Sequence, residues 1–182
     1  MLEQRIQQQF FESADLQYQA AETLTRPLAE AAAALISTLT NGGKVMLAGY
    51  GAGAALAAYV AQLFVTRFER ERPPLAALAL AALAPAAASQ LRALGLPGDV
   101  LLLIDDGETD CAPAIRAAQD KDMTLVVLAG RGNAAVSEWL AETDVLITLP
   151  ADRAARVVEL QLLVLHALCD AVDHQLLGEL EP

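Results

Sequence analysis

The chain of 182 residues carries a formal net charge of −11, and 55% of its residues are hydrophobic while only 4% are aromatic. This length favours a single domain with a sizeable core, and the shortage of aromatic side chains predicts a core of Ala, Leu and Val in closely packed helices. A surface this acidic repels phosphate backbones, which excludes direct binding of nucleic acids, whereas a basic protein partner is compatible with it.

The two cysteines, Cys111 and Cys169, match no CxxC or Cys/His ligand spacing. We therefore predict reduced structural thiols, and we expect neither a metal nor another cofactor. Residues 1–5 are polar and lack the apolar region of a signal peptide, and no run of about 18 apolar residues predicts a membrane span. The expected compartment is the cytoplasm.

Two helices are predicted ahead of the first strand. Residues 2–22 contain no Gly or Pro, and their apolar side chains recur at helical spacing. Thr25 and Pro27 are typical of an N-cap and the first helical turn, so a second helix is predicted to follow. Residues 1–41 therefore form an N-terminal helical segment in front of an α/β core at 42–182.

Short aliphatic runs alternate with longer helical stretches along the rest of the chain. This alternation predicts a three-layer αβα fold with a five-stranded parallel sheet in a flavodoxin-like order, which binds ligands at the carboxyl ends of its strands. The last helix is apolar almost all round, which predicts burial on two sides, one of them against another subunit. The predicted strands are 45–48, 75–80, 100–104, 123–128 and 145–149. The predicted helices of the core are 53–70, 81–94, 111–120, 134–141 and 152–177.

A glycine-rich stretch, Gly49-Tyr50-Gly51-Ala52-Gly53, joins the first predicted strand to the first helix of the core. Such a turn presents backbone N–H groups at a helix N-terminus, where the helix dipole favours an anion such as phosphate. The alternative is a structural turn, whose glycines let the helix pack closely on the sheet. We favour the structural interpretation.

An acidic loop, Asp105-Asp106-Gly107-Glu108-Thr109-Asp110, follows the third predicted strand. Its oxygens could hold a hard cation, but their spacing matches no calcium loop. Acidic residues also favour the start of a following helix, so we interpret the loop as a solvated helix cap, with contact to a basic partner as the alternative. His166 has no Ser or Cys partner nearby in sequence, and we interpret it as a packing residue rather than a catalyst.

Several stretches resemble a known family: 41–53, the run Arg67-Phe68-Glu69-Arg70-Glu71-Arg72-Pro73, 98–102 and 153–166. They are similar to the sugar isomerase (SIS) domain of the phosphoheptose isomerase family, and the similarity covers essentially the whole chain. Within that family the chain is most similar to the DiaA branch, whose members associate with the initiator DnaA. The resemblance implies a single SIS domain over 1–182 and a homotetramer in which the N-terminal helical segment serves oligomerisation.

The residues that carry isomerase chemistry in this family differ at the matching positions. The resemblance places the family's general base at Leu63, its catalytic histidine at Gln161 and a further histidine at Tyr59. The phosphate-binding hydroxyls are also replaced. Gly53 occupies the position where the family has a serine, and the acidic loop occupies the position of the family's Ser/Thr-rich loop. The resemblance implies that the family's metal site is absent as well. We expect Tyr50 to fill the vacated pocket.

The resemblance therefore implies a non-catalytic homotetramer that binds DnaA through repeated sites and promotes replication initiation. The implied partner-binding positions are Leu176 and Leu177. Two alternatives stay open: a phosphoheptose isomerase acting on sedoheptulose 7-phosphate, and a protein that binds a phosphosugar without reacting. The vestigial ligand pocket is assigned to Gly49, Tyr50, Gly51, Ala52, Gly53, Asp105, Asp106 and Thr109.

Overall fold

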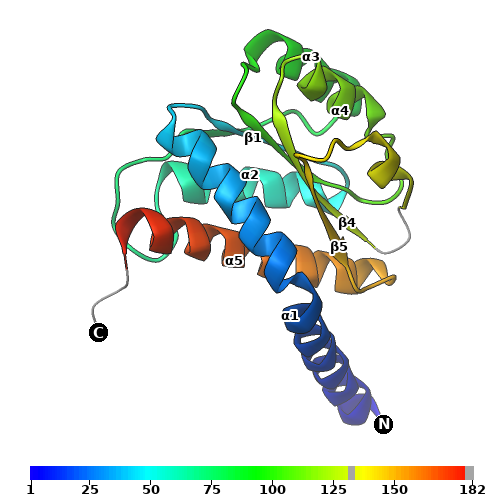
Figure 1. Cartoon of the computed structure of the whole chain (residues 1–182). Helices are drawn as coiled ribbons and strands as arrows, with labels where there is room; N and C mark the ends of the chain where they lie inside the picture. The colour runs from blue at the N-terminus through cyan, green and yellow to red at the C-terminus, as the bar shows by residue number, and fades with distance from the viewer. Residues whose placement is uncertain (131–133, 179–182) are drawn as a thin grey trace.

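A five-stranded parallel sheet in the order β2-β1-β3-β4-β5 lies between two layers of helices (Figure 1). The computed structural model describes residues 1–130 and 134–178, so part of the loop after β4 lies outside the described residues. The predicted αβα fold and the flavodoxin-like strand order are confirmed. The strands are β1 (Val45–Gly49), β2 (Ala77–Ala79), β3 (Val100–Ile104), β4 (Thr124–Gly130) and β5 (Val145–Leu149).

Side chains of alternate strand residues enter two separate cores. Val45 and Leu47 of β1 pack with α1, α2 and α5, whereas Met46 and Ala48 pack with α3, α4 and η1 on the other face. Both faces are covered, which explains why the strands read as continuous aliphatic runs. No helix within the described residues is long and apolar enough to cross a membrane. The helices are α1 (Leu2–Thr40), α2 (Ala52–Val65), α3 (Ala84–Leu94), α4 (Ala112–Gln119), the 3-10 helix η1 (Ala134–Trp139) and α5 (Ala154–Leu177).

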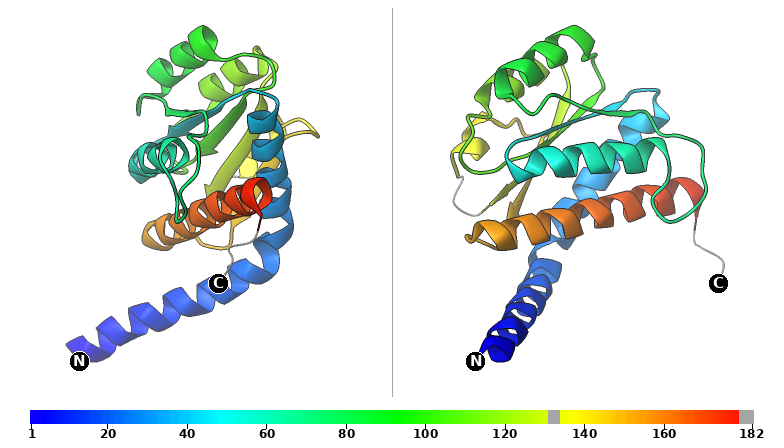
Figure 2. Two further views of the ribbon diagram at one scale, coloured as in Figure 1. Left: turned by 90° about the vertical axis from the view of Figure 1, so that its left-hand side faces the viewer. Right: turned by 180° about the vertical axis from the view of Figure 1, so that it is seen from behind.

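The N-terminal segment is one helix, so the prediction of two helices is wrong. Pro27 lies inside α1, and the hydroxyl of Thr25 bonds back to the carbonyl of Ala21 at 2.6 Å instead of capping a new helix. Such back-bonding and a proline bend a helix without ending it. Figure 2 shows the bend, which directs the first half of α1 away from the body of the molecule. We call residues 2–19 the arm; none of them is buried.

Helix α5 is covered on two sides within the same chain. It packs against α1 on one side and against α2 on the other, as both views in Figure 2 show. The apolar surface that predicted a neighbouring subunit is therefore occupied by these two helices. Leu163 and Leu177 are the large apolar side chains of α5 that stay exposed among the described residues.

Polar contacts hold the arm against the start of α5. Glu12 accepts a hydrogen bond from Arg153 at 2.9 Å, and Ser13 donates one to Glu159 at 2.9 Å. Arg156 donates to the backbone and side chain of Gln9, at 3.0 and 2.7 Å. The arm is thus attached through charged and polar groups, to which Leu16 adds an apolar contact with the core.

Acidification is expected to detach the arm. A hydrogen bond from Gln8, with Arg153 adding to it, lowers the pKa of Glu12 below 4.5, and the hydrogen bond from Arg156 lowers the pKa of Glu159 in the same way. A depressed pKa contributes stability that is present above the unfolded value and is lost as the pH falls through the folded value. Hydrogen-exchange protection of the arm should therefore be fully present well above pH 4.5 and should fall as the pH drops below that value. Unchanged protection would contradict this attachment.

Candidate functional site

An open cavity of about 490 Å³ lies at the carboxyl ends of the strands. The glycine turn after β1, the acidic loop after β3 and the start of α5 form its walls. This is where an α/β sheet of this order binds its ligands. The lining residues are Gly51, Ala52, Gly53, Asp105, Asp106, Gly107, Glu108, Gly130, Ala151, Asp152, Ala154, Val157, Val158 and Gln161.

The glycine turn is fixed by close packing. Gly51 has a φ of +53°, a conformation that favours glycine. A Cβ at Gly53 would lie 2.9 Å from the Cγ2 and carbonyl oxygen of Ile104, and a Cβ at Gly49 would meet the backbone of Gly53. This backbone leaves no room for a serine at position 53. The N–H groups of Gly51 and Ala52 bond to no backbone acceptor among the described residues, so the N-terminus of α2 can still bind an anion.

The carboxylates of the acidic loop hold the loop's own backbone. Asp106 accepts hydrogen bonds from the N–H groups of Glu108 and Thr109, at 3.0 and 2.7 Å, and from the Thr109 hydroxyl at 2.8 Å. Burial acts to raise the pKa of Asp106, but these hydrogen bonds outweigh it and hold that pKa below its usual value. Asp110 accepts a hydrogen bond from Ala112 at the start of α4. The loop therefore keeps its negative charge at neutral pH beside the glycine turn.

Gln161 connects the loop to α5. Its side chain is only 2% exposed, and its amide donates to the carbonyl of Asp105 at 2.8 Å. Asp105 in turn accepts from the N–H of Gly107 at 3.1 Å and from the thiol of Cys111 at 3.3 Å. Burial raises the pKa of Cys111, so this thiol stays protonated. Gln161 therefore lines the cavity and positions one of its walls.

Tyr50 does not fill the cavity. Its ring is 1% exposed and packs in the core between the sheet and the layer of α3 and α4. Burial, together with the nearby acidic loop, raises the pKa of Tyr50 to about 12. Gly49 and Thr109 also lie outside the lining, whereas Gly51, Ala52, Gly53, Asp105 and Asp106 belong to it. The expectation of a plugged pocket is therefore wrong, and the space is open.

A tyrosine–histidine pair joins α2 to α5 on the outer side of the two helices. The hydroxyl of Tyr59 lies 3.0 Å from Nε2 of His166, and the ring of Phe68 lies 5.3 Å from the imidazole. Tyr59 is 42% exposed and His166 is half-buried, so solvent reaches the pair. Sequence reasoning missed this pair because its members stand 107 residues apart.

The other residues assigned from the family resemblance have structural contacts. Leu63 packs partly buried against the core, and its carbonyl accepts a hydrogen bond from Arg72 at 2.9 Å. Leu176 also packs against that core, and Leu177 is 37% exposed at the end of α5. Because Leu176 packs against the core of its own chain, little of its side chain is available to contact a protein partner.

The fold and the position of the cavity are those of an SIS domain, and the sequence agrees with them. The sequence profile of the SIS domain matches residues 9–130, so the chain belongs to the SIS domain family. A phosphoheptose isomerase of Methylibium petroleiphilum is 48% identical over 98% of this chain and 97% of its own. One from an Azoarcus species is 41% identical over 96% of both chains.

Solved structures agree with these relatives. The phosphoheptose isomerase of Neisseria gonorrhoeae superposes with a TM-score of 0.85 at 32% identity, over 95% of this chain and 99% of its own. The phosphoheptose isomerase of Francisella tularensis superposes with a TM-score of 0.89 at 30% identity, over 96% of this chain and 99% of its own.

These similarities correct the functional prediction. The expectation of a non-catalytic, DnaA-binding protein is wrong, because the similar proteins that cover the whole chain carry the name of an enzyme. The inference failed because it tied each chemical role to one sequence position. Proton transfer can be supplied by any suitable group near the substrate, and the structure pairs Tyr59 with His166 on the same two helices that line the cavity, although neither residue is part of the lining.

Proposed function

We propose that this protein is a phosphoheptose isomerase, which interconverts a ketose phosphate such as sedoheptulose 7-phosphate with the corresponding aldose phosphate. The observation that carries the proposal is the open cavity of about 490 Å³ at the N-terminus of α2, in a chain whose relatives are named phosphoheptose isomerases. The backbone N–H groups of Gly51 and Ala52 would hold the phosphate. The carboxylate of Glu108, which lines the cavity, would accept hydrogen bonds from the sugar hydroxyls.

The reactive end of the sugar would lie toward the pair of Tyr59 and His166. Tyr59 follows Ala52 by seven residues on α2, about 10 Å along the helix axis, and His166 follows Val158 by eight residues on α5, about 12 Å. An extended seven-carbon chain spans a distance of this order. The spacing along the two helices therefore permits a phosphate at the glycine turn with a carbonyl carbon near the imidazole, and the proposal requires the sugar to extend beyond the residues that line the cavity.

Isomerisation moves one proton between two adjacent carbons and a second proton between the oxygens that those carbons carry. Imidazole suits this task because its pKa lies near neutrality, so it can take the proton from one carbon and return it to the next. In this proposal His166 moves the proton, and Tyr59 orients the imidazole through the hydrogen bond to Nε2. The hydrogen bond fixes which ring nitrogen is left for the substrate.

Removing the charge of Asp106 is expected to tighten binding of the phosphosugar. Its Oδ2 lies 3.1 Å from the position of a Cβ on Gly51, so it faces the proposed phosphate site. A unit charge at about 4 Å costs about 1 kcal/mol in water and about 4 kcal/mol near a protein surface. Asp106→Asn should therefore lower KM at least about fivefold, since the amide oxygen can still accept from Thr109.

The matched control is Asp110→Asn, because Asp110 caps α4 and does not line the cavity. Its KM should stay close to that of the parent protein. Equal KM values for both variants and the parent would place the phosphate away from the glycine turn.

We also propose that the arm mediates self-association into the homotetramer that the family resemblance implies. Large apolar side chains along it are exposed, and Phe10, Phe11 and Tyr18 have exposed fractions of 72%, 55% and 76%. Burying them against arms of other copies would remove this apolar surface from water. Sedimentation should show a species well above the 19.2 kDa chain, and Phe10→Glu with Phe11→Glu should reduce it. A monomer at micromolar concentration contradicts this assembly.

A turnover assay tests the proposed function. Purified protein incubated with sedoheptulose 7-phosphate should produce an aldoheptose phosphate, which has its own anomeric signals in proton NMR. A raised melting temperature without turnover would instead identify a phosphosugar-binding protein, since any ligand of the native state stabilises it. If the protein shows neither turnover of sedoheptulose 7-phosphate nor a raised melting temperature with it, the proposal is overturned.

A further inference from the structure

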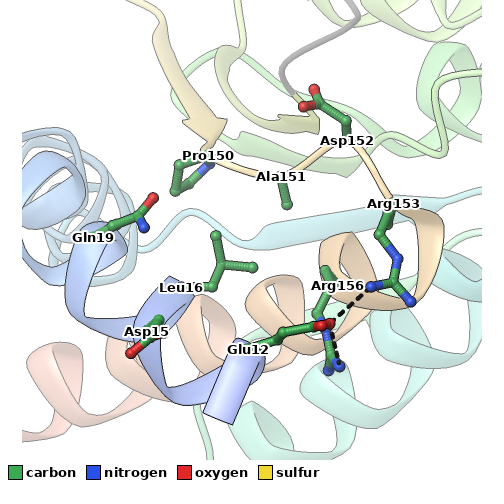
Figure 3. Close-up of a pocket in the computed structure, with 9 residues that line it drawn as sticks. All are labelled: Glu12, Asp15, Leu16, Gln19, Pro150, Ala151, Asp152, Arg153 and Arg156. Atoms are coloured by element: carbon green, nitrogen blue, oxygen red, sulfur yellow. Dashed lines mark hydrogen bonds and ion pairs between the residues drawn. The ribbon is translucent and has the colours of Figure 1, made fainter. Parts of the chain in front are cut away.

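A second cavity, of about 340 Å³, lies between the arm and the start of α5 (Figure 3). Ala151 and Asp152 line both cavities, so the segment 150–152 separates this one from the proposed substrate cavity. Its lining residues are Glu12, Asp15, Leu16, Gln19, Pro150, Ala151, Asp152, Arg153 and Arg156.

Two arginines lie at one end of this cavity, whose lining also contains the acidic residues Glu12, Asp15 and Asp152. Arg153 is the N-cap of α5 and Arg156 stands in its first turn, which contains no acidic residue. The N-terminus of a helix carries the positive end of its dipole, so two arginines there are unfavourable unless an anion accompanies them. Two carboxylates accompany them. Glu159 lies 2.5 Å from Nη1 of Arg156, and Glu12 of the arm lies 2.9 Å from Arg153 and 3.9 Å from Arg156 (Figure 3).

The guanidinium of Arg156 is not fully satisfied by these contacts. The residue is 7% exposed, and its Nε has no acceptor among the described residues. A buried donor without a partner costs about 1–3 kcal/mol, and such groups in native proteins often mark a ligand site. Glu12, by contrast, is one-third exposed on the arm and can be displaced without breaking a core.

The rest of the cavity suits a small organic body. Leu16, Pro150 and Ala151 present apolar atoms, and Gln19 offers an amide beside them (Figure 3). We propose that this cavity binds a small organic anion, whose phosphate or carboxylate group replaces Glu12 on Arg153 and Arg156. The ligand would contact the segment 150–152 and thereby the wall of the substrate cavity, which gives it a route to influence turnover.

Inorganic phosphate is the probe for this site, titrated by calorimetry at constant ionic strength. The parent protein should show two classes of binding, one for each cavity. Arg153→Ala should weaken one class about tenfold or more, because it removes a charged hydrogen-bond donor. Glu12→Gln should tighten the same class several-fold, because the internal competitor loses its charge.

Asp106→Asn serves as the matched control, since it should tighten only the other class. Arg153 and Glu12 are exposed, and their variants should keep the parent melting temperature and the parent turnover without phosphate. The proposal is overturned if phosphate binds the Arg153→Ala and Glu12→Gln variants as it binds the parent. It is also overturned if every binding class responds to Asp106→Asn.

Discussion

Arg72→Ala is expected to lower the free energy of unfolding by about 3–5 kcal/mol, the usual cost of breaking one side of a buried ion pair. The side chains of Arg72 and Asp173 are 2% and 3% exposed, and Nε lies 2.6 Å from the carboxylate. The same guanidinium donates to the carbonyls of Phe64 and Leu63 at the end of α2, at 2.8 and 2.9 Å. Its loss leaves a buried carboxylate and two carbonyls without this donor. Urea unfolding followed by circular dichroism measures the effect.

Arg67→Ala is the matched control for this prediction. Arg67 pairs with Glu71 on the surface, where its side chain is 57% exposed, and such pairs contribute about 0–1 kcal/mol. Asp173→Asn should cost less than Arg72→Ala, because the amide oxygen can still accept from Nε and the guanidinium keeps its two carbonyl acceptors. If Arg72→Ala is no more destabilising than Arg67→Ala, Arg72 does not hold α2 to α5.

His166→Ala is expected to lower kcat by about 10²–10⁴, the range over which a positioned acid–base group contributes. The imidazole is the proposed acid–base group, and the Tyr59 hydroxyl lies 3.0 Å from its Nε2. KM should change little, because the proposed phosphate contacts lie on the glycine turn. Steady-state kinetics with sedoheptulose 7-phosphate measure both values.

Two further variants separate chemistry from packing. Tyr59→Phe removes only the hydroxyl and should lower kcat less than His166→Ala, since the imidazole stays in place. Leu163→Ala lies on the exposed side of the same helix, where Leu163 is 41% exposed, and should leave kcat unchanged. Equal losses of kcat in all three variants would indicate a disturbed helix rather than a lost catalyst.

The strands could be predicted because each is a short, mostly aliphatic run, which is typical of a parallel strand that is buried on both faces. Val100–Ile104 and Val145–Leu149 match their predicted bounds, and the confirmed strand order follows from the alternation with helices. The N-terminal break could not be predicted correctly, because Thr25 and Pro27 carry the signature of a helix start. Packing of the helix on the core kept it continuous there, and tertiary contacts override such local signals.

Part of the candidate site could be predicted from the sequence, because glycines and acidic residues follow two of the predicted strands. The glycines at 51 and 53 and the acids at 105 and 106 lie where sheet topology places loops, so their meeting follows from the strand order. The direction in which Tyr50 points could not be read, because a residue at a strand end can enter either core. Contacts between helices, such as Tyr59 with His166, depend on how α2 and α5 pack and leave no local signal.

The structure of His166→Ala with bound sedoheptulose 7-phosphate tests most directly whether the cavity and the Tyr59–His166 pair form one isomerase site. The variant should bind the substrate without converting it. The phosphate is expected within hydrogen-bond distance of the Gly51 and Ala52 N–H groups, and the carbonyl end of the sugar beside Tyr59 at the place of the missing imidazole. A sugar bound with its carbonyl end away from Tyr59, or with its phosphate on Arg153, would show that the cavity and the pair do not form one isomerase site.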